Sequence, residues 1–302
     1  MGRRLFEILI FRPFHLIAKH ILIHLPYKWF VRIMKQVNLL FMFMKPKWRK
    51  RTLDRIELFE RYSGNSIDKN KCLATFGVVA ANYIFAARAK PGLIKAVVGV
   101  EDEQVLKEIE NNKGKGMIWL TCHSMGLPLF VRILQNDIGE TVYFRPLSDP
   151  TSPIEDVMQE MQDNHGFKML RPTNIKESLE EYLERGATIL TSYDVYIDKG
   201  IEVDFLGGKT LAGPGIIAIA EKLKVPILPI FVIETRPDYY EIQIKSALKM
   251  EYNNDSEFDL QKTSQNMVSE IERIILLYPE QWTWPVTTSF IRRPPPLIWK
   301  TN

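Results

Sequence analysis

From about residue 95 onward, short apolar runs alternate with segments of helical periodicity. The runs are rich in Ile, Val, Tyr and Phe, and we expect strands at 116–123, 141–147, 187–194, 226–234 and 240–247. Apolar residues at helical spacing predict helices at 124–135, 153–164, 174–185, 213–224 and 257–277. This alternation predicts an α/β fold with a mixed, largely parallel sheet flanked by helices, in which functional side chains lie beyond the carboxyl ends of strands.

The first 55 residues have a different pattern, because cations interrupt their apolar groups. They contain thirteen Lys and Arg against Glu7 and Asp54, a charge of +11, which leaves 4 − 11 = −7 for the rest of the chain. No uninterrupted apolar run reaches the roughly 18 to 20 residues that a membrane-spanning helix needs. We therefore expect an N-terminal amphipathic helical region that associates with a membrane, its cations near anionic headgroups. The alternative is that these helices pack on the protein's own core and that the basic run 45–51 is a solvated face.

Composition excludes several classes of protein. With 302 residues, 46% of them hydrophobic and 25% charged, the chain is globular and can bury a sizeable core. The two cysteines and five histidines have no metal-site spacing, so no metal is expected. The chain has no GxxxxGK[ST] or GxGxxG, so no nucleotide cofactor is expected either. The basic region is interleaved with aliphatic rather than stacking aromatic residues, and nucleic acid is therefore not an expected partner.

The stretch LTCHSMG, residues 120–126, ends the first predicted strand and contains two candidate sites. Around Ser124 it is close to the G-x-S-x-G nucleophile elbow of serine hydrolases, with Cys122 in place of the first glycine. That reading needs an acid and then a histidine further along the chain, but the only later histidine is His165. The other reading makes His123 a general base at the end of a strand.

Residues 95–290 resemble the bacterial lipid A biosynthesis (lauroyl/myristoyl) acyltransferases of the lysophospholipid acyltransferase superfamily. The resemblance rests on four motifs in one order: GMIWLTCHSMG (116–126), VYFRP (142–146), TSYDVYIDKGIEVDFLGGKTLAGPGIIAIAEKLKVPILPIF (191–231) and YPEQWTW (278–284). We therefore expect three parts. They are basic amphipathic membrane-interface helices (1–55), a helical connector (56–95) and an α/β acyltransferase-like domain (96–302).

The resemblance implies that an acceptor hydroxyl attacks an acyl thioester while His123 accepts the hydroxyl proton. Arg145 would stabilise the oxyanion or hold a phosphate, and the helix start at Gly213 and Gly215 would also face an anion. The implied donor is an acyl-carrier protein or acyl-CoA, and the implied acceptor is a membrane glycolipid or lysolipid. The implied location is the cytoplasmic face of the bacterial inner membrane, with peripheral or monotopic attachment.

The sequence departs from the family signature of a histidine followed, five residues later, by Asp or Glu. Pro128 occupies that position and has no acceptor to orient the His123 ring. Asp194, Asp149 or Asp204 could replace the acid, and we take Asp194 as the second catalytic residue. The alternatives are that His123 works unassisted, or that the protein is a catalytically inactive acyltransferase fold that binds lipid or a partner. We interpret the YPEQWTW motif as aromatic packing.

Overall fold

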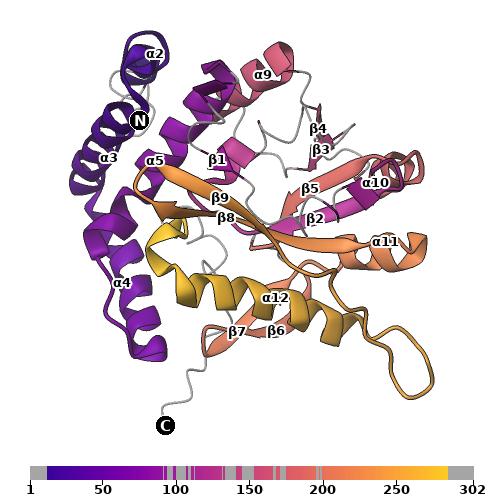
Figure 1. The fold of residues 1–302 in the computed structure, drawn as a ribbon. Helices are drawn as coiled ribbons and strands as arrows, with labels where there is room; N and C mark the ends of the chain where they lie inside the picture. Colours follow the sequence, from indigo (N-terminus) through magenta and orange to yellow (C-terminus); the bar gives the residue numbers. More distant parts are fainter. Residues whose placement is uncertain are drawn as a thin grey trace.

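The computed structural model describes residues 12–90, 92–93, 98–99, 107, 110–111, 113–130, 132, 141–144, 153–165, 168–170, 175–194, 197 and 199–284. In this part of the chain, seven strands form one sheet in the order β1-β9-β8-β2-β5-β3-β4 (Figure 1). Their bounds in chain order are Val98–Gly99 (β1), Met117–Thr121 (β2), Thr141–Phe144 (β3), Lys168–Leu170 (β4), Thr188–Ser192 (β5), Ile227–Arg236 (β8) and Tyr239–Ile244 (β9).

The direction of the strands confirms the predicted fold class. Strand β2 lies between β5 and β8 and is parallel to both. Strand β3 is parallel to β5 and to β4, whereas β9 runs antiparallel to β8. The sheet is therefore mixed and largely parallel.

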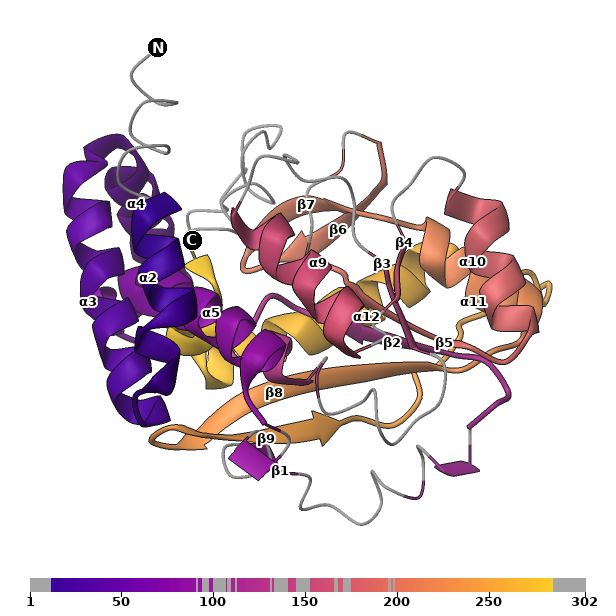
Figure 2. The same ribbon diagram turned by 90° about the horizontal axis from the view of Figure 1, so that it is seen from above.

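Helices cover both faces of the sheet (Figure 2). Met117 and Trp119 of β2 share one apolar cluster with α2, α3, α5 and α9, whereas Ile118 and Leu120 point into the cluster of α4, α10, α11 and α12. Both faces of β2 are thus buried, as is usual for parallel sheets. The helix bounds are Arg12–His20 (α2), Leu22–His24 (η2), Tyr27–Met44 (α3), Pro46–Ser63 (α4), Lys69–Arg88 (α5), Pro153–His165 (α9), Ile175–Glu184 (α10), Gly215–Leu223 (α11), Leu260–Leu277 (α12) and Pro279–Gln281 (η3).

The N-terminal helices have a buried and an exposed side. Helix α3 packs closely on α5, since a side chain at Gly77 would meet the Met34 carbonyl and the Asn38 Cβ. On its other side, α3 exposes Leu40 and Phe43, 59% and 73% accessible. The N-terminal helices thus pack on the protein's own core, which was the alternative to membrane association, but they also leave apolar side chains exposed to the outside. In the described part of the chain no helix combines the length and hydropathy needed to cross a bilayer.

The expected boundary between residues 55 and 56 falls inside a single helix, because α4 runs without interruption from Pro46 to Ser63. The end of the basic region and the start of the connector therefore share one helix. The division of the chain into three parts stays a prediction.

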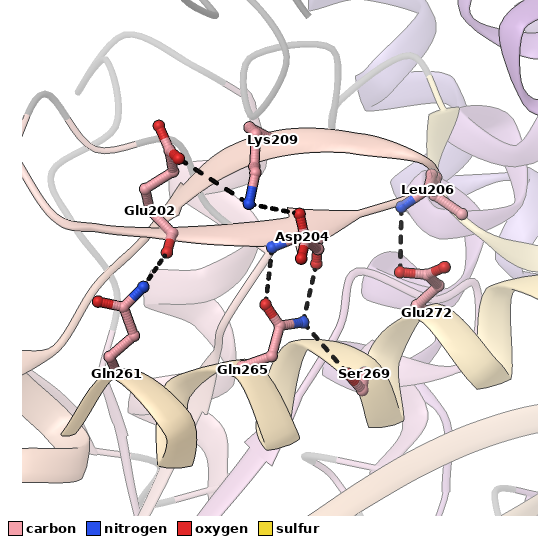
Figure 3. A network of polar contacts seen from close by, with 8 residues as sticks. All are labelled: Glu202, Asp204, Leu206, Lys209, Gln261, Gln265, Ser269 and Glu272. Carbon is pink, nitrogen blue, oxygen red and sulfur yellow. Dashed lines mark hydrogen bonds and ion pairs between the residues drawn. The ribbon is translucent and has the colours of Figure 1, made fainter. Parts of the chain in front are cut away.

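The sequence predicted no strand between the strand at 187–194 and the helix at 213–224, but 201–205 and 208–212 form a hairpin. Strands β6 (Ile201–Phe205) and β7 (Gly208–Ala212) pair antiparallel around Leu206 and Gly207, both at positive φ. Side chains of α12 occupy the free edge of β6 (Figure 3). Gln265 accepts from the Asp204 amide at 2.7 Å and donates to the Asp204 carbonyl at 3.0 Å, and Glu272 accepts from the Leu206 amide. The helix thus satisfies backbone groups that a third strand would otherwise pair.

Candidate functional site

The register of two adjacent parallel strands brings His123 and Asp194 together. Thr121, the last residue of β2, pairs with Ser192, the last residue of β5. Beyond these ends the Tyr193 amide still donates to the Thr121 carbonyl at 2.8 Å. His123 and Asp194 each follow their strand by two residues, so they lie opposite each other at the carboxyl edge of the sheet.

The Asp194 carboxylate accepts hydrogen bonds from three donor groups. The His123 ring Nδ1 lies 2.7 Å from Asp194 Oδ1. The His123 backbone amide bonds both carboxylate oxygens, at 3.1 and 2.9 Å. The indole Nε1 of Trp282 donates to Oδ2 at 2.8 Å. Both oxygens of the carboxylate are thus hydrogen-bonded. The His123 amide and the Trp282 indole can only donate, and the His123 ring donates when Nδ1 carries the proton.

The charge of Asp194 fixes the state of the imidazole. Burial alone would raise the pKa of this carboxyl, but the His123 charge and hydrogen bonds, with the Trp282 indole, hold its pKa below the ordinary value. An ionised carboxylate beside Nδ1 requires the ring proton on Nδ1, so in neutral His123 the Nε2 atom carries the lone pair. The Asp194 side chain is 1% exposed and that of His123 is 26% exposed, so the ring is reachable from outside. The pair can therefore accept a proton at Nε2.

The segment after α12 holds the His123 loop from the other side. The Thr283 amide donates to the His123 carbonyl at 2.9 Å, and the Met125 amide donates to the Gln281 carbonyl at 3.1 Å. Trp282 and Trp284 are also buried and packed together, with ring centroids 4.8 Å apart. The sequence predicts aromatic packing here but does not predict the hydrogen bond from Trp282 to Asp194. The YPEQWTW motif was the available signal.

The other predicted site residues have different places. Asp204 is paired with Lys209 on the outside of β6, so it does not supply the acid for His123. Gly213 and Gly215 flank Pro214 at the start of α11, and the space beside Gly215 is open. No hydrogen bond joins either glycine to the His123–Asp194 pair among the described residues. Arg145 and Asp149 lie outside the described residues.

The geometry around Ser124 does not resemble that of an activated serine. Its hydroxyl donates to the Val232 carbonyl at 3.1 Å, and the residue is 4% exposed. Burial also raises the pKa of the neighbouring Cys122 thiol well above its ordinary value. Both side chains therefore act in packing, while the adjacent imidazole is the reachable group.

Among the described residues, no group of three or more His, Cys, Asp and Glu side chains is placed to hold a metal ion.

An α/β fold with a strand-end histidine beside a buried carboxylate can remove a proton from a hydroxyl, as hydroxyl acyltransfer requires. Comparison with known families matches residues 6–286 to the family described as bacterial lipid A biosynthesis acyltransferase. Because the match covers nearly the whole chain, the protein belongs to this family, which is one of membrane-associated acyltransferases. A search of curated proteins found no match.

Proposed function

We propose that this protein moves a fatty acyl chain from a thioester donor to a hydroxyl of a glycolipid or lysolipid, with His123 as the general base. The observation that carries the proposal is the contact between His123 Nδ1 and Asp194 Oδ1 at 2.7 Å, because it leaves Nε2 as the proton acceptor. In this proposal Asp194 replaces the acid that Pro128 removes from the family motif.

The proposed reaction follows from that arrangement. Nε2 of His123 takes the hydroxyl proton as the acceptor oxygen bonds to the thioester carbonyl carbon. The carbon–sulfur bond then breaks, and the proton on Nε2 passes to the departing thiolate. Asp194 stabilises the transient imidazolium and holds its orientation. Arg145 and the amides of the Gly213–Gly215 turn are proposed to stabilise the oxyanion or a substrate phosphate.

The proposed donor is an acyl-carrier protein or acyl-CoA. Carrier proteins are acidic, so the charge of +11 over residues 1–55 favours their approach as well as that of an anionic membrane. The exposed apolar side chains of α2 and α3 support peripheral or monotopic attachment to a membrane. The proposed location is the cytoplasmic face of the bacterial inner membrane. In this arrangement residues 1–55 contact the lipid, and the acyltransferase-like domain begins at about residue 96.

Acyl transfer tests the proposal directly. Purified protein is incubated with an acyl-carrier-protein or CoA thioester and a lipid acceptor, and acylated product is measured by mass spectrometry. His123→Ala is expected to lower kcat/KM by about 10²- to 10⁴-fold, the usual contribution of a placed base. Ser124→Ala is the matched neighbour and should retain activity. Equal background rates in wild type and His123→Ala would end the proposal.

A second candidate function is that of an inactive relative that binds lipid or a partner, which the loss of the motif acid at Pro128 favours. It predicts binding of the acceptor lipid without any turnover in the same assay. Lipid mass spectrometry of a strain lacking the protein then separates the two candidate functions. If the protein is an active transferase, a lipid of that strain lacks one acyl chain, and the missing chain identifies donor length and acceptor together.

A further inference from the structure

A pocket of about 340 Å³ lies between α3 and the turn that joins β8 to β9, apart from the His123–Asp194 pair. Lys28, Arg32 and Lys35 line the side formed by α3. Their spacing of four and then three residues places them on one face of the helix. Glu234 and Asp238 line the side formed by β8 and the following turn. The pocket therefore has one cationic and one anionic wall.

The two walls do not neutralise each other. No ion pair joins Lys28, Arg32 or Lys35 to Glu234 or Asp238, although the structure describes all five residues. One oxygen of Glu234 accepts from the Asp238 amide at 2.9 Å, which fixes the turn but leaves both negative charges in place. Because these opposite charges face the same pocket and form no ion pair with each other, a zwitterionic ligand can bind between them.

The surroundings indicate that the pocket lies at a lipid surface. Trp29 lines the pocket and is itself 48% exposed. Along the preceding α2 and η2 segments, further large apolar side chains are exposed: Leu16, Ile17, Ile21 and Leu25. Tryptophan is enriched where apolar chains meet headgroups. A charged pocket beside an apolar surface matches a phospholipid, whose charged headgroup lies next to its acyl chains.

We propose that this pocket binds a phosphoethanolamine group, the headgroup of a zwitterionic aminophospholipid. The phosphodiester lies against Lys28, Arg32 and Lys35, and the primary ammonium donates to Glu234 and Asp238. A purely anionic group would be repelled by the two carboxylates, and a purely cationic one by the three cations. Choline fits less well, because its quaternary nitrogen has no N–H to donate and only Trp29 offers an aromatic face.

The pocket lies at the same edge of the sheet as the proposed base. The Glu234 amide donates to the Gln281 side chain at 2.7 Å, and the Gln281 amide group donates back to the Glu234 carbonyl at 2.9 Å. Gln281 directly precedes Trp282, which donates to Asp194. A headgroup in the pocket thus sets the carboxyl edge of the sheet against the bilayer. The lipid source of the ligand rests on the proposed membrane attachment, whereas the pocket chemistry does not depend on acyl transfer.

Vesicle binding tests this inference. The full chain is mixed with vesicles of phosphatidylglycerol with phosphatidylethanolamine, or with phosphatidylcholine, at the same negative charge, and the bound fraction is measured by flotation. Wild type is expected to bind the ethanolamine vesicles about fivefold more tightly, as two partly exposed ion pairs allow. The double variant Glu234→Gln with Asp238→Asn should lose this preference but keep binding to phosphatidylglycerol. Asparagine tolerates the positive φ at Asp238, so the turn should persist.

Matched controls separate the pocket from general electrostatics and from catalysis. Glu184→Gln with Asp255→Asn removes the same charge from exposed positions outside the pocket, and should retain the ethanolamine preference. His123→Ala should also retain it, so a failed transferase assay does not decide this question. An ethanolamine preference that is absent in wild type, or that survives in Glu234→Gln/Asp238→Asn, overturns the inference. Calorimetric binding of soluble glycerophosphoethanolamine without any vesicle preference overturns the lipid source and assigns the pocket to a soluble zwitterion.

Discussion

At the scale of single residues, every hydrogen-bond partner of Asp194 in the described part of the chain is a donor. A carboxylate offers two acceptor oxygens, and both are used by His123 and Trp282. An amide at this position would turn its NH₂ toward one of these donors, or present it to Nδ1 and favour the wrong ring tautomer. Asp194→Asn is therefore expected to lower kcat/KM by about 10²- to 10⁴-fold with the fold retained in circular dichroism. Unchanged transfer would show that His123 needs no carboxylate.

The same carboxyl predicts a pH dependence of stability. Its pKa in the folded protein lies below the ordinary value of 3.8, so its contribution is present above that pH and disappears as the pH falls toward the lowered value. The difference in free energy of unfolding between wild type and Asp194→Asn should therefore be largest near neutrality and shrink below about pH 4. Urea denaturation at a series of pH values measures it. A difference that stays constant down to acid would contradict an ionised Asp194.

Trp282 is expected to act through Asp194 as a positioning residue. Trp282→Phe keeps an aromatic ring near Phe205 and Trp284 but removes the N–H that bonds Oδ2. We expect roughly a tenfold fall in kcat with little change in KM, the loss of about one charge-assisted hydrogen bond. The matched control is Trp284→Phe, whose indole donates to the Pro279 carbonyl instead. The NMR shift of the His123 Nδ1 proton should move in the first variant and stay in the second.

Part of this site could be predicted from the sequence, and part could not. Apolar strands that end just before a histidine and an aspartate indicate that both lie at one edge of a parallel sheet. Their direct contact depends on β2 and β5 being neighbours in exact register, which is a tertiary property. Trp282 lies 88 residues from Asp194 in the chain and reaches it only because α12 returns across the sheet. The local sequence pattern therefore predicts His123 and Asp194 but not the Trp282 indole that also donates to Asp194.

At the scale of elements, hydrophobic runs predicted the strands that are buried on both faces. β2 and β8 consist largely of buried apolar residues, so their signal is continuous. The hairpin was missed because β6 alternates polar and apolar residues beside glycines, and its edge is completed by α12 side chains. β1 and β4 span only two and three residues, too short for a periodic signal.

The close packing of α3 on α5 gives an element-scale prediction. A methyl group at Gly77 would press on the backbone of Met34, which cannot rotate away. Gly77→Ala is therefore expected to lower the free energy of unfolding by about 1 to 3 kcal/mol, despite the better helix propensity of alanine. Gly92→Ala is the control, because its added methyl group meets nothing within 4 Å. Thermal denaturation of both variants checks this, and a stabilised Gly77→Ala would show that the two helices separate easily.

At the scale of the whole molecule, apolar and basic surfaces lie together on the N-terminal helices. Leu40→Ser with Phe43→Ser should weaken binding to phosphatidylglycerol vesicles about tenfold or more, because two inserted side chains are lost. Stability should change little, since both residues are exposed. Leu277→Ser removes a leucine as exposed as Leu40, 59%, from the end of α12 and should bind normally. Equal weakening by Leu277→Ser would mean that the lipid contacts another surface.

The return of the chain to residues 281–283 also determines when the site can be complete. Synthesis runs from the amino terminus, so the basic helices emerge from the ribosome well before Trp282 does. Until then the His123 loop lacks the backbone bonds from Thr283 and Gln281, and Asp194 lacks its indole donor. A nascent chain can therefore reach the bilayer before its acid–base pair is assembled, and any product truncated before α12 ends carries the histidine without its support.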